Sequence, residues 1–352
     1  MPLNIDSAIG DGLARGQTLP APWYADPAIF AAERERIFNR SWQYAGHLGQ
    51  VARPGDFFTA QIGDVPIVVT RDGDAKLRAF ANVCRHRGSE VVLECSGNRR
   101  TLQCHYHGWT YNLDGSLRNA PRADEQESFA KESLGLLPLG LDTLGPLVFV
   151  NPNRGADPFS TMIGNLPRTI AQAGVDLSQM RWLRRDVYEF AANWKIVIEN
   201  FNECYHCPIA HPKFSEFIDT DKYRSDTSNE FVSTYFGPYF KPDGAGVTYA
   251  TLWPNAMLAA SLNPMALQVI CAHPIDAGHT HETVDYFFAE GTTEPEIRNY
   301  AELSDLVTRE DVVLCESVQR GMRSGVIEHG SLMLSRERGI QHFQGLVYKS
   351  LR

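Results

Sequence analysis

Two short segments, CRHRG at residues 84–88 and CHYHGW at residues 104–109, decide how the first part of this chain folds. Each segment places one thiolate close to one imidazole, and both side chains are ligands for transition metals. The two segments therefore predict one metal centre held from two neighbouring loops. Its four candidate ligands are Cys84, His86, Cys104 and His107.

The ligand types and their order distinguish between two kinds of centre. A structural zinc site more often has four thiolates, or a thiolate pair and a histidine pair. One Cys and one His in each segment suit a Rieske-type [2Fe–2S] cluster, in which two Cys hold one iron and two His hold the other. Imidazoles in place of thiolates remove negative charge, so such a cluster accepts an electron more readily. We predict this cluster, with zinc as the alternative.

Length and composition are those of an ordinary globular protein. The 352 residues allow two domains, and the net charge of −9 argues against a nucleic-acid partner. No apolar run approaches the roughly 18–20 residues that span a membrane. The first residues also lack the basic and apolar regions of a signal peptide. We therefore expect a cytoplasmic protein with no membrane contact.

The cysteines outside the two segments do not suggest a disulfide framework. The total of seven is odd, and the thiols are scattered along the chain, which fits reduced cysteines in the cytoplasm. The pair Cys204-x-x-Cys207 resembles half of a zinc or redox site, but no second such pair completes it. We interpret it as two small side chains on a helix that ends near Pro208.

The texture of the chain predicts an α+β protein with three parts. Residues 1–40 form an N-terminal helical segment that packs on the catalytic domain, with Asp26 capping a short helix. Residues 41–155 alternate short Val-, Ile- and Phe-rich runs with Gly-Asp and Asp-Gly turns, which predicts an all-β domain. Residues 156–352 contain strand-like runs and two final helices near 295–323 and 336–351. They predict an antiparallel sheet flanked by helices, of helix-grip type.

A second group of metal-binding residue types follows Asn193-Trp194-Lys195 in the catalytic part. His206 and His211 lie five residues apart with Pro208 between them, so they do not form an HExxH zinc helix. Two imidazoles and one distant carboxylate form the facial triad of non-haem Fe(II), which leaves positions open for O₂ and substrate. The sequence therefore predicts a mononuclear iron site.

The carboxylate must come from elsewhere in the chain. Asp311 lies on the apolar stripe of the helix near 295–323, where an unpaired acid is costly. We predict Asp311 as the third ligand, with Glu310 or Asp305 as substitutes. The alternative is that Asp311 binds no metal and instead pairs with a buried Arg or Lys. Glu203 precedes His206 by three residues, so on one helix face it can orient that imidazole towards the metal.

Both groups, in this order, resemble the Rieske non-haem iron oxygenases, also called ring-hydroxylating oxygenase α subunits. The matching motifs extend over most of the chain and include Asn193-Trp194-Lys195 and Glu203-x-x-His206-x₄-His211. The resemblance implies a head-to-tail homotrimer in which the cluster passes electrons to the mononuclear iron of the adjacent chain. By position, Glu203 would link His206 to His107 of that chain. Many members of the family have Asp at this bridging position. The Glu at position 203 resembles instead the branch that oxidises glycine betaine, carnitine and proline betaine.

The resemblance implies a terminal oxygenase that uses O₂ and receives electrons from NAD(P)H through a separate flavin- or ferredoxin-type reductase. We expect oxidative N-demethylation of a quaternary ammonium compound. An aromatic-ring hydroxylase or O-demethylase is the first alternative, and an electron-transfer Rieske protein is the second. Aromatic side chains hold quaternary ammonium groups by cation–π contacts. The candidates for substrate contact are Tyr235, Phe236, Tyr249 and Trp253, with Tyr239 and Phe240 nearby.

Overall fold

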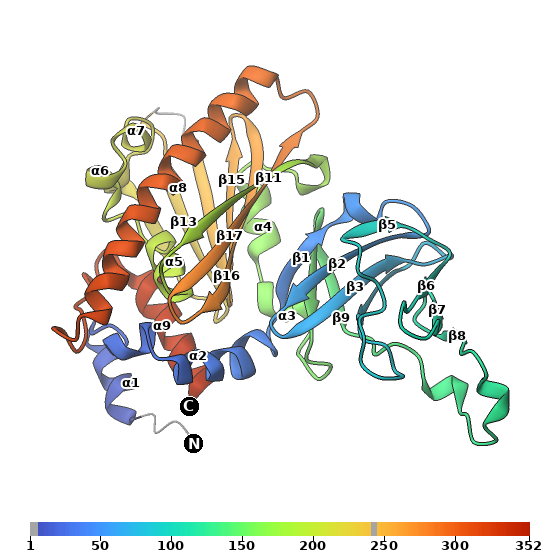
Figure 1. Ribbon diagram of the computed structural model, residues 1–352. Coiled ribbons are helices and arrows are strands. Elements are labelled where there is room, and N and C mark those ends of the chain that lie inside the picture. Colours follow the sequence, from blue (N-terminus) through green and yellow to red (C-terminus); the bar gives the residue numbers. More distant parts are fainter. Residues whose placement is uncertain (1–5, 241–244) are drawn as a thin grey trace. The chain divides into compact units, whose positions relative to one another are not determined.

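The computed structural model describes residues 6–240 and 245–352, which form two compact units (Figure 1). One unit is Phe38–Asp157, and the other combines Met1–Ile37 with Pro158–Arg352. The N-terminal segment therefore belongs to the same unit as the C-terminal half. These limits differ by a few residues from the predicted boundaries after residues 40 and 155.

The unit Phe38–Asp157 consists of short antiparallel strands in three small sheets. The first sheet has the order β1-β10-β9, the second β4-β3-β2-β5 and the third β6-β7-β8. The strands are β1 Gln43–His47, β2 Asp56–Ile62, β3 Val65–Arg71, β4 Leu77–Ala81, β5 Ser96–Asn98, β6 Thr101–Gln103, β7 Thr110–Asn112, β8 Leu117–Asn119, β9 Gly140–Leu144 and β10 Leu147–Asn151.

Two apolar clusters form the core of this unit. One contains Phe58, Ile67 and Val148, all fully buried between strands. The other contains Cys84 and Cys104 among large apolar side chains of the neighbouring strands. The loops that follow β4 and β6 therefore rest directly on a packed core, which holds both thiols in place.

The second unit is built on one seven-stranded antiparallel sheet with the order β11-β17-β16-β15-β14-β13-β12. Its long strands β16 and β17 pair over most of their length, from Ala266 opposite Phe288 to Asp276 opposite His279. The strands are β11 Met180–Phe190, β12 Arg224–Asp226, β13 Val232–Pro238, β14 Gly246–Leu252, β15 Ala256–Leu262, β16 Met265–Asp276 and β17 His279–Ala289.

The long helix α8 lies against one face of this sheet (Figure 1). Two hydrogen bonds fix this contact: Tyr188 Oη donates to Asp305 at 2.9 Å, and Tyr286 Oη donates to Ser304 at 3.1 Å. The helices are α1 Ser7–Ala14, α2 Pro27–Glu33, α3 Phe159–Ile163, α4 Leu166–Gln172, α5 Trp194–Phe201, α6 Cys207–Ala210, α7 Pro212–Ser215, α8 Glu294–Arg323 and α9 Arg338–Leu351. Short 3₁₀ helices are Ala21–Tyr24, Leu48–Val51, Ala123–Glu125, Lys131–Ser133, Leu177–Gln179 and Thr220–Lys222.

The predicted fold class is confirmed: an all-β domain accompanies an antiparallel sheet with flanking helices. Asp26 caps α2 through its side chain, as predicted, and Asn193 caps α5 in the same way. None of the described helices is long and apolar enough to cross a membrane.

Two local predictions are wrong. Cys204 and Cys207 do not share a helix, because α5 ends at Phe201 and α6 begins at Cys207. The two residues are joined by a disulfide bond instead of remaining reduced thiols.

Candidate metal centres

The two cluster segments fold into closely similar turns. In the first, the N–H of Gly88 donates to the carbonyl of Cys84 at 3.0 Å, and in the second the N–H of Gly108 donates to that of Cys104 at 3.0 Å. Both glycines have positive φ, +80° and +73°, a conformation that side chains with a Cβ rarely adopt. Each glycine thus allows its loop to turn back and place Cys and His on the same side.

The four candidate ligands form an inner and an outer pair. The two thiols are buried, with Cys84 3% and Cys104 2% exposed, whereas both imidazoles lie on the surface. The rings of His86 and His107 are 4.5 Å apart between centroids. Sulfur and nitrogen thus separate into two adjacent pairs, an arrangement that suits two metal ions with different ligands.

This separation fits a binuclear cluster better than a single zinc ion. Around one zinc, all four ligand atoms would lie within about 4 Å of one another, given Zn–S and Zn–N bonds of roughly 2.1–2.3 Å. Among the described residues, the groups of three or more ligand atoms within 4.8 Å of one another do not include these four side chains. The donor set and its spacing therefore fit a [2Fe–2S] cluster, with Cys84 and Cys104 on one iron and His86 and His107 on the other.

Aromatic side chains enclose the predicted cluster. Trp109 stacks on His86 with ring centroids 5.0 Å apart and planes 8° from parallel. Tyr111 lies beneath, with its hydroxyl 3.4 Å from Cys84 Sγ. Tyr106 contacts His107 and is 54% exposed, so it shields the site less than Trp109 does. Hydrogen bonds to a ligand sulfur and restricted water access both influence a cluster's reduction potential.

The second predicted centre is brought together from two distant segments. His206 precedes the short helix α6 and His211 follows it, while Asp311 comes from the middle of α8. Nε2 of His211 lies 3.1 Å from Nε2 of His206 and 3.0 Å from Asp311 Oδ1. Nε2 of His206 lies 3.6 Å from Asp311 Oδ1. The three predicted ligand atoms therefore converge.

These distances can be compared with those that a metal ion requires. With metal–ligand bonds of about 2.1 Å, neighbouring positions of an octahedron lie roughly 3 Å apart. The three observed separations of 3.0–3.6 Å are close to this value. The residues therefore fit a facial triad on one face of an Fe(II) ion. Asp305, one of the substitute ligands, is excluded because it binds Arg309 and Tyr188 instead.

The outer nitrogens of both imidazoles are held by carboxylates. Glu203 contacts Nδ1 of His206, and Glu310 Oε2 lies 2.7 Å from Nδ1 of His211. Such contacts set the tautomer and direct Nε2 towards the metal. Glu203 acts from a turn and not from a shared helix face, which corrects the sequence-based reasoning. The role of Glu310 was missed, since it was considered only as a substitute ligand.

The charge balance in this centre favours a bound cation. Burial alone would lower the pKa of His211, but the nearby carboxylates of Asp311 and Glu310 raise it above its ordinary value. Asn200 Nδ2 donates to Asp311 Oδ1 at 2.7 Å and orients that carboxylate. A metal ion can take the place of the proton that these acids attract to His211.

The predicted substrate aromatics separate into two groups. Tyr235 and Tyr249 are direct cross-strand neighbours, and Tyr223, which the sequence did not single out, stacks on Tyr235 at 6.0 Å. Trp253 instead packs against core aromatics, and Phe236 lies outside this group beneath the guanidinium of Arg224. Of the four predicted substrate residues, Tyr235 and Tyr249 therefore lie together in one tyrosine group.

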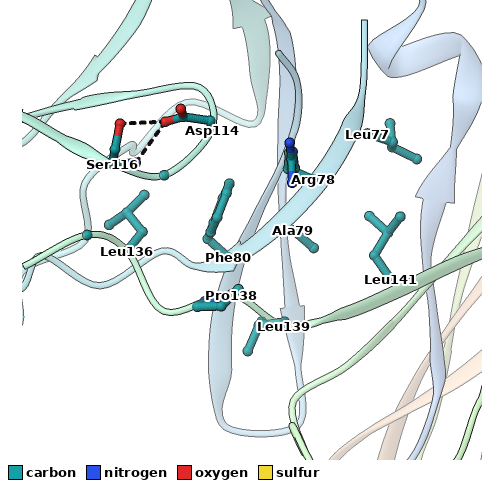
Figure 2. Close-up of a pocket in the computed structure, with 12 residues that line it drawn as sticks. Leu77, Arg78, Ala79, Phe80, Asp114, Ser116, Leu136, Pro138, Leu139 and Leu141 are labelled. Carbon is teal, nitrogen blue, oxygen red and sulfur yellow. Dashed lines mark hydrogen bonds between the residues drawn. The ribbon is translucent and has the colours of Figure 1, made fainter. Parts of the chain in front are cut away.

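A cavity of about 560 Å³ lies elsewhere, on the unit Phe38–Asp157 (Figure 2). Its lining includes Leu77, Phe80 and Leu139, and its rim carries Asp114, which accepts a hydrogen bond from Ser116 Oγ at 2.6 Å. It contains none of the predicted ligands. We assign no catalytic role to it.

Comparison with known families agrees with both centres. Residues 41–130 match the Rieske [2Fe–2S] domain, and residues 177–239 and 240–351 match the catalytic domain of the ring-hydroxylating α subunit. The choline monooxygenase of Spinacia oleracea is 34% identical over 95% of this chain and 78% of its own length. The oxygenase subunit of carnitine monooxygenase from Acinetobacter pittii is 33% identical over 94% of both chains. The chain belongs to the Rieske non-haem iron oxygenases.

Solved structures place the similarity more narrowly within this family. A quaternary ammonium Rieske monooxygenase studied for carnitine oxidation superimposes with a TM-score of 0.90 at 31% identity, covering 100% of both chains. The same class of enzyme in complex with L-carnitine gives 0.86 at 33% identity, covering 97% of both. A naphthalene 1,2-dioxygenase bound to phenanthrene, at 20% identity and a TM-score of 0.79 over 95% of this chain and 93% of its own, shares the fold.

Proposed function

We propose that this chain is the terminal oxygenase of a system that oxidises a quaternary ammonium compound with O₂. The observation that carries the proposal is the convergence of His206, His211 and Asp311 in a chain whose relatives act on choline and carnitine. Iron bound there would supply O₂ activation, and the Rieske cluster would supply electrons. Cys84, His86, Cys104 and His107 would hold the cluster.

The chain's own residues prepare this chemistry. Glu203 and Glu310 fix the tautomers of the two imidazoles, and Asn200 orients Asp311. The reaction consumes one O₂, two electrons and two protons, and it inserts one oxygen atom while forming one water. Hydroxylation of an N-methyl carbon would give a hemiaminal that breaks its C–N bond, releasing formaldehyde and the demethylated amine. N-demethylation is the outcome we predict.

The source of electrons is part of the proposal. We infer a separate NAD(P)H-dependent reductase of flavin or ferredoxin type, because two relatives are described as oxygenase subunits of a larger system. A homotrimer in which Glu203 links His206 to His107 of the adjacent chain remains a prediction. A cytoplasmic location also remains one.

A substrate panel tests the proposal. Purified oxygenase with a surrogate reductase is supplied with choline, L-carnitine, glycine betaine and a benzoate, and O₂ uptake and formaldehyde are measured. We expect O₂ uptake that depends on a quaternary ammonium compound, with one formaldehyde per O₂ if an N-methyl group is attacked. Release of a different aldehyde would show that the enzyme oxidises another carbon bonded to the nitrogen. A cis-diol or phenol from the arene would favour the aromatic-ring alternative.

Iron content distinguishes the proposed oxygenase from the alternative, a Rieske protein that only transfers electrons. A Rieske protein without oxygenase activity would hold about two Fe per chain, whereas the oxygenase would hold about three. The geometry of His206, His211 and Asp311 favours the higher number.

A further inference from the structure

Glu282 on β17 is a buried acid without a partner. Only 5% of the residue is exposed. Among the described residues, none donates a hydrogen bond to its carboxyl group or forms an ion pair with it. Burial, together with the negative charge of Asp311, raises the pKa of Glu282 to about 8. A glutamate is rarely buried in this way unless it is paired.

Comparison with the other buried carboxylates shows how unusual this is. Every other buried Asp or Glu of the described chain has a basic partner. In the same unit, Glu33 pairs with Lys195 at 2.6 Å, Asp219 with Lys222 at 2.7 Å, and Asp285 with Arg185 at 2.6 Å. In the other unit, Asp56 pairs with Arg53 at 3.9 Å and Asp72 with Arg78 at 3.0 Å. Glu282 alone lacks the cation that makes burial of a carboxylate tolerable.

Two contacts show which face of β17 carries Glu282. Tyr286 Oη donates to Ser304 of α8 at 3.1 Å, and Thr280 Oγ1 donates to the carbonyl of Ala192 at 2.8 Å. The N–H of the residue after Ala192 in turn donates to Gln319 Oε1 of α8 at 2.7 Å. Side chains at every second position of a strand share one face. Glu282 therefore faces the side of the sheet on which α5 and α8 pack.

The same contacts place Glu282 along α8. The strand rises about 20 Å between Thr280 and Tyr286, and the helix rises about 22 Å between Ser304 and Gln319. The two elements thus lie alongside each other over this length, with both ends fixed. Glu282 is one third of the way from the Thr280 end, which brings it opposite the turns of α8 that carry Asp311 and Cys315. This is the region of the predicted iron site.

The cross-strand neighbours of Glu282 on its face do not pair with its carboxyl group. Its cross-strand partners are Ala272 on β16 and Tyr188 on β11. Ala272 is a small side chain, and the Tyr188 hydroxyl is directed to Asp305. Among the described residues, Lys195 is the only Lys or Arg that is buried, and it is already paired with Glu33. The described residues therefore offer no buried Lys or Arg that is left to pair with Glu282.

We propose that Glu282 pairs with the ammonium group of the substrate and selects a cation over a neutral molecule of the same shape. This inference rests on the proposed function and adds the specificity-determining residue. A quaternary ammonium group has no N–H to donate, so a carboxylate and aromatic faces are its natural partners. The pairing would place the methyl groups of the cation near the iron site, because Glu282 and Asp311 are neighbours across the sheet–helix interface.

Binding measurements on the oxygenase with both metal centres loaded test the proposal. Choline is compared with 3,3-dimethylbutan-1-ol, which replaces the N⁺ of choline by carbon, using titration calorimetry. We expect Glu282→Gln to lower the affinity for choline by about tenfold or more and to leave the affinity for the alcohol unchanged. Glu282→Asp, which keeps the charge, should retain part of the preference. Iron content and the Rieske absorption should not change in either variant.

A matched control lies on the same strand. Asp285 is buried on the opposite face and already paired, so Asp285→Asn should lower stability without changing the ratio of the two affinities. If Glu282→Gln does not fold, Glu282→Asp decides, because an unchanged affinity ratio after the carboxylate is withdrawn by one methylene contradicts direct pairing. An unchanged ratio in Glu282→Gln overturns the proposal for Glu282 alone. Absence of turnover with every quaternary ammonium compound would overturn the proposed function itself.

Discussion

Glu203 and Glu310 occupy equivalent positions behind the two imidazoles of the predicted iron site. Each holds an Nδ1 atom and so directs the opposite nitrogen of its ring towards Asp311. The two acids differ in their surroundings, because Glu203 is also anchored by the backbone N–H groups of Tyr205 and His206. Glu203 is thus fixed by the loop that carries His206, while Glu310 is fixed on α8. This pair offers a way to separate a role in orientation from a role in electron transfer.

Glu203→Gln should keep both metal centres but slow electron transfer from cluster to iron. An amide can still contact Nδ1, so iron binding should persist, but the charge proposed to link the two centres is lost. Stopped-flow oxidation of the reduced cluster by O₂ in the presence of substrate measures this rate. Glu310→Gln is the control, since it alters the same kind of contact and should leave the rate within a few-fold of the parent. Equal rates in the parent and Glu203→Gln would refute the bridging role.

His107→Ala should abolish the visible absorption of the Rieske cluster. The substitution would remove one of the two protein ligands of the outer iron, and the exposed position of this imidazole pair would let water reach the cluster. His105→Ala is the matched control, because His105 lies in the same loop but is not a predicted ligand. Absorption and iron content are measured together. Persistence of the spectrum without His107 would mean that the ligand assignment is wrong.

At the scale of elements, one buried ion pair attaches the N-terminal segment to the helix that precedes the iron site. Lys195 Nζ and Glu33 Oε1 lie 2.6 Å apart with both side chains fully buried, and Trp194 Nε1 donates to Glu33 Oε2 at 2.8 Å. Glu33 belongs to α2 and the other two residues to α5. Removing one partner leaves the other charge without compensation in the core.

Glu33→Ala should therefore destabilise the protein by about 3–5 kcal/mol. Chemical denaturation followed by circular dichroism measures the free energy of unfolding. The control is Glu35→Ala, since this exposed residue two positions later should change stability by less than about 0.5 kcal/mol. A small effect of Glu33→Ala would show that the pair does not anchor α2.

Local patterns in the sequence were sufficient to predict most elements. The helices expected near 295–323 and 336–351 are α8 at Glu294–Arg323 and α9 at Arg338–Leu351. Alternation and helical periodicity are properties of neighbouring residues, so they can be read without the fold. The candidate metal ligands could also be proposed from the sequence, because ligand chemistry restricts their residue types.

Contacts between residues far apart in the chain could not be predicted from the sequence in this way. The pairing of Glu310 with His211 spans 99 positions, and nothing in the local pattern of α8 distinguishes Glu310 from an exposed acid. The unpaired state of Glu282 is visible only when its surroundings are known. The Cys204–Cys207 disulfide was missed because residues 202–206 form a turn where a continuous helix was expected.

At the scale of the whole molecule, the two compact units each carry one predicted metal centre. The candidate ligands in the unit Phe38–Asp157 are cysteines and histidines. In the unit with the seven-stranded sheet they are histidines and a carboxylate. Soft ligands suit an electron-transfer cluster, and hard carboxylate with imidazole suits an Fe(II) ion that binds O₂. The central claim is that both centres, with different ligands, are present in a single chain.

Metal and sulfide analysis of anaerobically reconstituted protein tests this claim most directly, with the parent chain and Asp311→Ala measured side by side. The account predicts about three Fe and two acid-labile sulfides per parent chain, and about two Fe with unchanged sulfide in Asp311→Ala. Zinc in place of the cluster, or equal iron content in the two proteins, would contradict it.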